Sequence, residues 1–158
     1  MSQELSQIGL STQKSEELTS KLNNLLSNYQ VFYMNVRGFH WNIKGNRFFE
    51  LHLKFEELYS DALLKVDEIA ERILTLGFTP AHTYSDYMSI SEIKEAKNFS
   101  DANSTVGNIL DSFRILLVKE REILNFANEL NDDGTSSQMS DYIREQEKLV
   151  WMYSAYLS

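Results

Sequence analysis

The chain has 158 residues, of which 42% are hydrophobic and 12% aromatic, enough to build the core of one domain. It contains no cysteine, which excludes disulfides, thiolate metal sites and cysteine nucleophiles. The net charge of −8, with no basic run, argues against a free-standing DNA binder and fits both solubility and the attraction of cations. Neither a secretory signal nor a run of roughly 18 apolar residues is present, so we expect a cytoplasmic protein that does not enter membranes.

The first long segment is predicted to be an amphipathic helix. One proline and six glycines are too few for a β-rich chain of this length, which favours long helices. Apolar residues recur at helical spacing from Leu18 to Val36 and predict a helix over about 15–41. Residues 1–14 are expected to form a flexible N-terminal tail. The segment 43–46 supplies a tight turn, because its glycine and asparagine tolerate positive φ.

A second helix is predicted over about 47–76, ending at a glycine cap. Gly77 follows the last residue of its apolar stripe, and Pro80 lies just beyond, as expected for a sharp stop. Residues 78–101 then form a long crossover. A short helix is expected within it over 89–96, where a serine and a glutamate have capping-box spacing.

Two further helices complete the prediction. Apolar spacing predicts the third over about 102–130, the Asn-Asp-Asp-Gly run at 131–134 breaks it, and the fourth covers about 135–156. Two short connections and one long one between four long helices describe an all-α, ferritin-like four-helix bundle over 15–158, with a short extra helix in the crossover.

Histidines and carboxylates on the first two helices are candidate metal ligands. His40 and His52 flank the short turn, so the antiparallel helices bring them close together. Asp67 and Glu71 lie four residues apart and project from one face of the second helix. At 100° per residue, these two acids share an arc of about 100° with His52 and Glu56.

The spacing along the second helix divides these candidates between two chains. His52 and Asp67 are separated by roughly 22 Å at about 1.5 Å per residue, whereas metal–ligand bonds are about 2 Å long. A two-fold axis near the middle of the helix would place His52 of one chain opposite Asp67 of another, giving two equivalent sites. Imidazole and carboxylate ligands with open positions suit Fe(II), and zinc or manganese would suit the same atoms. A lone carboxylate on a helix is more often a solvated residue, so the joint geometry carries this hypothesis.

Three runs resemble the Dps family of mini-ferritins, the DNA-binding proteins from starved cells. They are FHWNIKGNRFFELH at 39–52, FEELY at 55–59 and DEIAERI at 67–73. The likeness continues through Gly77 and Pro80 to the C-terminal Glu-Lys-x-x-Trp-Met, and so covers nearly the whole chain after the tail.

The resemblance implies a hollow dodecamer with ferroxidase sites between subunits, whose ligands match His40, His52, Asp67 and Glu71. Glu56 matches a position that often assists a second iron. The family oxidises Fe(II), in many members with hydrogen peroxide preferred over oxygen, stores the ferric mineral and so limits oxidative damage. The resemblance therefore implies an oxidoreductase acting on metal ions, with one or two irons at each site.

Two other features of the family, a protective aromatic residue and an acidic iron-entry pore, have candidate residues in this chain. Trp41 resembles an aromatic residue that takes up stray oxidising equivalents, and a role as a core aromatic is the alternative. The family's acidic iron-entry pore lies around the turn before the last helix, where Asp132, Asp133 and Asp141 are candidates. One usual aspartate position is Ser137 in this chain, and a solvated acidic turn is the other interpretation.

Competing functions differ in testable sequence features. Family members that bind DNA usually use basic tails, but Lys14 is the only basic residue of the segment 1–14, so binding through the tail is not expected. A DNA-compacting protein with secondary metal binding remains the alternative function, and an adhesin, allergen or immune-activating role on the same scaffold is a third. A classical ferritin site needs Glu-x-x-His pairs, which none of the three histidines provides.

Overall fold

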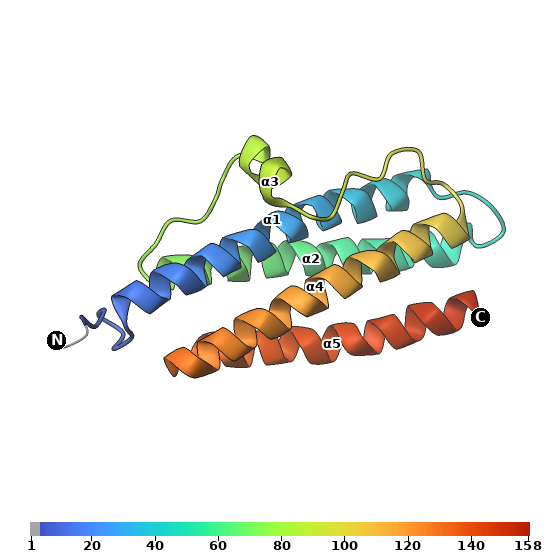
Figure 1. Cartoon of the computed structure of the whole chain (residues 1–158). Helices are drawn as coiled ribbons and strands as arrows, with labels where there is room; N and C mark the ends of the chain where they lie inside the picture. The colour runs from blue at the N-terminus through green and yellow to red at the C-terminus, as the bar shows by residue number, and fades with distance from the viewer. Residues whose placement is uncertain (1–3) are drawn as a thin grey trace.

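The computed structural model describes residues 4–158, in which five helices and no strand occur (Figure 1). The helices are α1 (Thr12–Asn42), α2 (Phe48–Thr75), α3 (Tyr84–Ile90), α4 (Ala102–Leu130) and α5 (Asp133–Leu157). Within these residues no helix has the length and apolar character needed to cross a bilayer. Positions 1–3 of the expected N-terminal tail lie outside the described residues.

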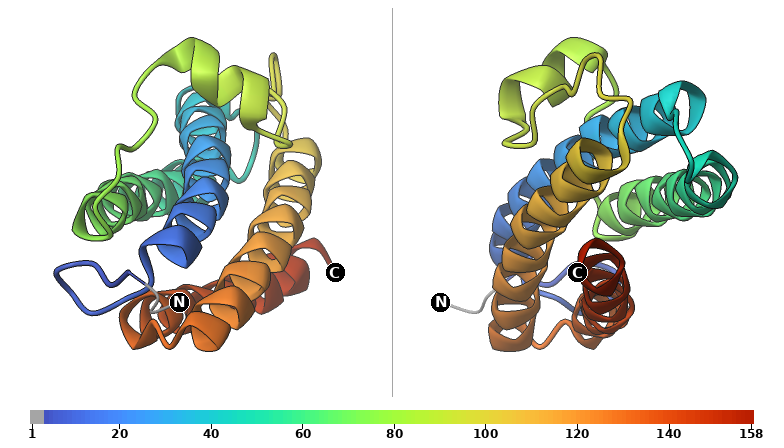
Figure 2. Two further views of the ribbon diagram at one scale, coloured as in Figure 1. Left: turned by 60° about the vertical axis from the view of Figure 1, so that its left-hand side comes forward. Right: turned by 90° about the vertical axis from the view of Figure 1, so that its right-hand side faces the viewer.

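Four long helices form the bundle, arranged as two antiparallel pairs. Helix α1 packs against α2 and α4 packs against α5, while α1 and α4 connect the two pairs. The crossover from α2 to α4 carries α3 across the outer side of α1 (Figures 1 and 2). The core is aromatic as well as aliphatic, and its largest fully buried side chains include Tyr29, Phe32, Phe39, Phe55 and Phe113. The all-α, ferritin-like prediction is confirmed.

The ends of α1 and α2 follow from local capping. Helix α1 begins at Thr12, three residues earlier than expected, because the Ser11 hydroxyl accepts a hydrogen bond from the amide of Lys14. Helix α2 ends as predicted, with Gly77 at φ +96°. The amide of Gly77 bonds to the Leu74 carbonyl and that of the next residue reaches back to Ile73, which is a Schellman cap.

The short helix in the crossover lies earlier than the sequence analysis placed it. It occupies Tyr84–Ile90 rather than 89–96, and Thr83 caps it. Two asparagines of α1 bind the backbone of the segment after it and keep that segment from forming a helix. The Asn28 side-chain oxygen accepts from the amides of residues 92 and 93, both at 3.0 Å, and that of Asn35 accepts from the amide of Ala96 at 2.9 Å. Backbone donors that a helix would use internally are therefore bound to α1.

Candidate metal centre

The two histidines at the α1–α2 turn bind each other's backbone. His40 Nδ1 lies 2.6 Å from the carbonyl oxygen of His52, and His52 Nδ1 lies 2.7 Å from the carbonyl oxygen of His40. A carbonyl oxygen can only accept, so both Nδ1 atoms carry the hydrogen and donate it. In the neutral rings Nε2 is then unprotonated in both residues, which is the form that binds a metal ion.

Aromatic packing fixes the orientation of both imidazoles. The two rings stack with centroids 3.8 Å apart at 12°, Phe48 stacks on His52 at 5.0 Å, and Tyr59 meets His40 edge-on at 5.3 Å. His40 is buried and His52 is half-buried. The turn between the helices is held by the amide of Lys44, which donates to the Ser100 carbonyl at 2.9 Å. Packing and hydrogen bonds together preorganise the histidine pair.

The acidic candidates lie elsewhere on α2. Asp67, Glu71 and Glu56 are exposed, and within residues 4–158 of one chain no group of three or more His, Asp or Glu residues is gathered as a metal site. One subunit therefore brings together His40 and His52 but not the carboxylates. The same outward face of α2 exposes large apolar side chains, namely Phe49 (84%), Leu53, Leu63, Leu64 and Leu74.

Trp41 lies beside the histidines but outside the core. Its side chain is 58% exposed, and the Arg37 guanidinium lies 4.9 Å from the ring centroid. The alternative role of a core aromatic does not fit this exposure.

The three pore candidates have different environments. Asp133 is exposed, and Asp141 is exposed and pairs with Arg144 at 3.0 Å. Asp132 is buried, accepts from the amide of Thr135 at the start of α5, and forms an ion pair with Arg72 at 2.6 Å. The carboxylate of Asp132 is thus engaged in capping α5 and joining it to α2. Of the three candidates, Asp133 alone is exposed and has no ion pair among the described residues.

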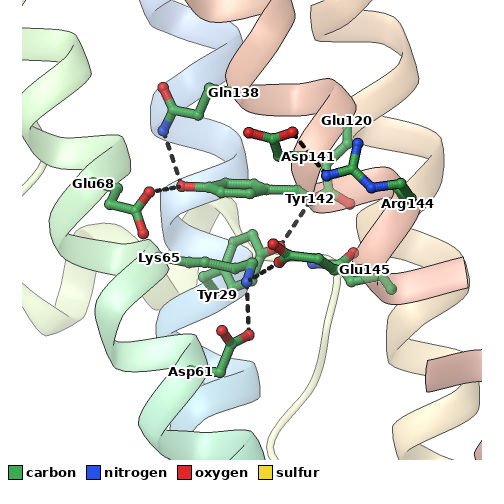
Figure 3. A network of polar contacts seen from close by, with 11 residues as sticks. Tyr29, Asp61, Lys65, Glu68, Glu120, Gln138, Asp141, Tyr142, Arg144 and Glu145 are labelled. Carbon is green, nitrogen blue, oxygen red and sulfur yellow. Dashed lines mark hydrogen bonds and ion pairs between the residues drawn. The ribbon is translucent and has the colours of Figure 1, made fainter. Parts of the chain in front are cut away.

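A second polar group, which the sequence analysis missed, lies at the centre of the bundle (Figure 3). Tyr29 of α1 donates to Glu120 of α4 at 2.8 Å and accepts from Gln146 of α5. Lys65 of α2 lies alongside, paired with two carboxylates. Burial raises the pKa of Glu120 to about 8, because it penalises the charged carboxylate. One signal could have found this group: Lys65 falls on the apolar stripe of its helix, four residues before Ile69.

The fold defines a ferritin-like four-helix protein, and comparisons with known proteins agree. A family model for the ferritin-like domain matches residues 19–158. An uncharacterized protein of Haemophilus influenzae is 60% identical over 148 residues, covering 94% of this chain and 92% of that protein. The "DNA protection during starvation protein" of Porphyromonas gingivalis is 44% identical, covering 94% of this chain and 93% of its own.

Solved structures narrow the class to one family. A Dps protein of Vibrio cholerae O1, described as a member of a broad superfamily of ferritin-like diiron-carboxylate proteins, superposes with a TM-score of 0.97 at 55% identity. The match covers 100% of this chain and 99% of that one. A Dps protein of Bacillus brevis has a TM-score of 0.89 at 33% identity over 92% and 98% of the two chains. The chain belongs to the Dps family.

Proposed function

We propose that this protein is an iron-detoxifying and iron-storing mini-ferritin whose ferroxidase sites form between subunits. Each site would take His40 and His52 from one chain and Asp67 and Glu71 from its partner, with Glu56 assisting a second iron. The carrying observation is the reciprocal Nδ1–carbonyl pairing of the histidines, which leaves two Nε2 atoms free in a protein with only three histidines. His82 is not included, since it is exposed and its Nδ1 bonds to the Pro80 carbonyl at 2.9 Å.

The outward face of α2 supports pairing of two subunits. Large apolar side chains exposed on a helix mark an interaction surface, and here they flank the acidic candidates on both sides along the helix. An isologous contact about a two-fold axis would bury Leu63 and Leu64 near its centre and bring each histidine pair towards the partner's acids. Closure of such dimers into a hollow dodecamer in the cytoplasm is the assembly that the family membership favours.

Hydrogen peroxide is the oxidant in the proposed reaction. Two Fe(II) ions each give one electron to hydrogen peroxide, which takes up two protons and becomes two water molecules. No hydroxyl radical is released, because both electrons reach the same oxidant. Imidazole nitrogens hold Fe(II), while the carboxylates neutralise the charge of the Fe(III) product before it moves to the mineral. Oxygen is the alternative oxidant.

Anaerobic loading with Fe(II), followed by peroxide or oxygen, tests the site. We expect ferric absorbance to rise fast in the wild type and at least tenfold more slowly in Asp67→Ala. Asp86→Ala, which removes an exposed aspartate from α3, is the matched control and should behave as the wild type. Equal rates in Asp67→Ala and the control would overturn the assignment.

Mixed assembly tests whether the site is shared between chains. His52→Ala and Asp67→Ala cages should each be nearly inactive. After co-refolding in equal amounts, a mixed pair holds one intact site and one doubly altered site, so about one quarter of all sites are restored. If each chain held its own complete site, mixing would restore no activity.

Relatives named for DNA protection during starvation make DNA compaction the second candidate. The acidic surplus, with Lys14 as the only basic residue of the segment 1–14, opposes it. A gel shift at low salt without Mg²⁺ separates the two functions. Tight binding that weakens steeply with salt would favour the DNA role.

A further inference from the structure

The polar cluster at the bundle centre draws one or more side chains from each long helix. Figure 3 shows Tyr29 from α1, Lys65 from α2, Glu120 from α4 and Glu145 from α5. Gln146 also belongs to α5. Tyr29, Glu120 and Gln146 are almost fully buried, so the cluster lies inside the bundle and away from the histidine pair at the α1–α2 turn. Ferritin-like di-iron proteins bind their metals in this part of the bundle, through inward carboxylates from all four helices.

A lysine side chain supplies the positive charge of this cluster. The Lys65 ammonium lies 2.7 Å from an Asp61 oxygen, 2.9 Å from a Glu145 oxygen and 5.0 Å from the centroid of the Tyr142 ring. Its side chain is only 4% exposed, whereas the two carboxylates are 43% and 51% exposed. The charge of Lys65 is therefore fixed inside the bundle by acids that reach in from its rim.

The cluster also has more oxygen acceptors than donors. Glu120 Oε1 and Gln146 Oε1 are buried and have no hydrogen-bond partner among the described residues. Both side chains bond to the same Tyr29 hydroxyl, so their free oxygens belong to one small volume. The Tyr29 ring and the Lys65 ammonium both lie against the Tyr142 ring, so Lys65 borders this volume, with Asp61 and Glu145 on its own outer side. Carboxylate and amide oxygens, such as those of Glu120 and Gln146, are the ligands that hard divalent cations prefer.

We propose that Lys65 is a tethered cation that occupies the place of a metal ion at the bundle centre and thereby keeps Fe(II) out of it. An ammonium group repels a divalent cation at short range and holds the carboxylates that such a cation would need. Lys65 is thus a specificity-determining residue. In naming iron, this inference rests on the proposed function, and it directs iron to the sites shared between subunits.

Counting bound Mn²⁺ tests the inference without relying on iron oxidation. The protein would carry Asp67→Ala and Glu71→Ala, so that the shared sites do not contribute, and binding would be followed anaerobically at about pH 8 through the electron paramagnetic resonance signal of free Mn²⁺. We expect Lys65→Ala to gain about one Mn²⁺ per subunit, and the added change Glu120→Gln to abolish the gain. Lys54→Ala is the matched control, because it removes an exposed, carboxylate-paired lysine from the same helix and should gain none.

The outcomes are distinguishable from those of the ferroxidase test. No additional Mn²⁺ in folded Lys65→Ala would overturn the inference, and so would a gain that survives Glu120→Gln. Should Lys65→Ala fail to fold, Lys65→Met keeps the volume of the side chain and replaces it in the test. One arm needs no lysine variant: with Lys65 present, Glu120→Gln must leave Mn²⁺ binding unchanged, and loss of an ion there would show that Lys65 excludes nothing.

Discussion

Helix α2 carries acidic residues in two opposite environments. On its outward face Asp67 and Glu71 are exposed and have no cation of their own chain among the ion pairs of the described residues. Towards the bundle, Asp61 pairs with the Lys65 ammonium, whose positive charge opposes the rise that burial causes in the pKa of Glu120. The same side-chain chemistry is thus left open on one face and closed by a tethered charge on the other.

The difference shows that acidic residues alone do not define a metal site. A cation binds where ligands converge, are deprotonated and are not already neutralised. In the histidine pair both Nδ1 atoms are bound to carbonyls, so Nε2 is the nitrogen that each neutral ring can offer to a cation. The bundle centre fails the third because of Lys65. In the proposed pairing a partner subunit would complete the outward face, whereas nothing can displace a covalently attached ammonium.

The largest effect is expected when His52, a proposed ligand beside the outward face, is replaced. His52→Ala removes a proposed ligand and also the donor to the His40 carbonyl, so we expect Fe(II) oxidation to fall about 100-fold. His82→Ala is the control, since it removes a histidine that is exposed and distant in sequence from the pair. Stopped-flow absorbance after peroxide addition measures both. A loss below twofold in His52→Ala would remove the histidine pair from the proposed site.

On the inner face, the buried carboxyl of Glu120 should make the stability of the protein depend on pH. The pKa of Glu120 is raised from 4.5 to about 8 in the folded protein, mainly by burial, against opposing effects of Tyr29, Lys65 and Arg121. Between these two values the folded state holds a proton that the unfolded state has lost, so this group lowers stability as pH rises and its effect levels off above about 8.

Replacing that carboxyl by a neutral amide removes the dependence. We expect Glu120→Gln to gain roughly 2–4 kcal/mol of unfolding free energy relative to the wild type between about pH 5 and pH 9. Guanidinium unfolding at one protein concentration measures the difference. Glu122→Gln changes an exposed neighbour on α4 and should show no such trend. A constant difference across the range would contradict a protonated Glu120.

The turn between α4 and α5 shows the same contrast between a paired and an exposed aspartate. Asp132 is ion-paired with Arg72 and caps α5, whereas the neighbouring Asp133 is exposed. We expect Asp132→Ala to cost about 2 kcal/mol of stability, because it removes a cap and leaves the guanidinium unpaired. Asp133→Ala should leave stability nearly unchanged and slow iron entry instead. Thermal unfolding and the rate of mineral growth distinguish the two, and equal melting temperatures would show that the cap contributes little.

Apolar spacing and turn residues predicted most of the fold. The limits of α4 were correct to the residue, and Gly77 marked the end of α2, because a glycine at positive φ is a local requirement. The position of α3 was wrong, because it depends on tertiary contacts. Asn28 and Asn35 bind the backbone after it, and nothing in the crossover sequence itself indicates their approach.

The sequence predicted the histidine pair beside the outward face of α2, but it did not predict the polar cluster on the inner face. A short turn between antiparallel helices was sufficient to place His40 beside His52, as the structure confirms. The reciprocal carbonyl bonds were beyond prediction, since they depend on the register of two helices to within a fraction of a turn. On the inner face, Lys65 interrupts an apolar stripe, but only the folded bundle brings it to Glu145, 80 positions along the chain.

The smallest effect is expected at Trp41, next to the open site. Its ring is more than half exposed and makes a cation–π contact with Arg37, so it can be oxidised without disturbing the core. Trp41→Phe should change the rate of Fe(II) oxidation by less than twofold, because it removes neither a ligand nor a hydrogen bond to one. It should instead alter which side chains are oxidised during peroxide turnover, and mass spectrometry after repeated iron loading would show this. Trp151→Phe, at an exposed tryptophan on α5, is the matched control. If both variants gave the damage pattern of the wild type, Trp41 would have no part in protecting the centre.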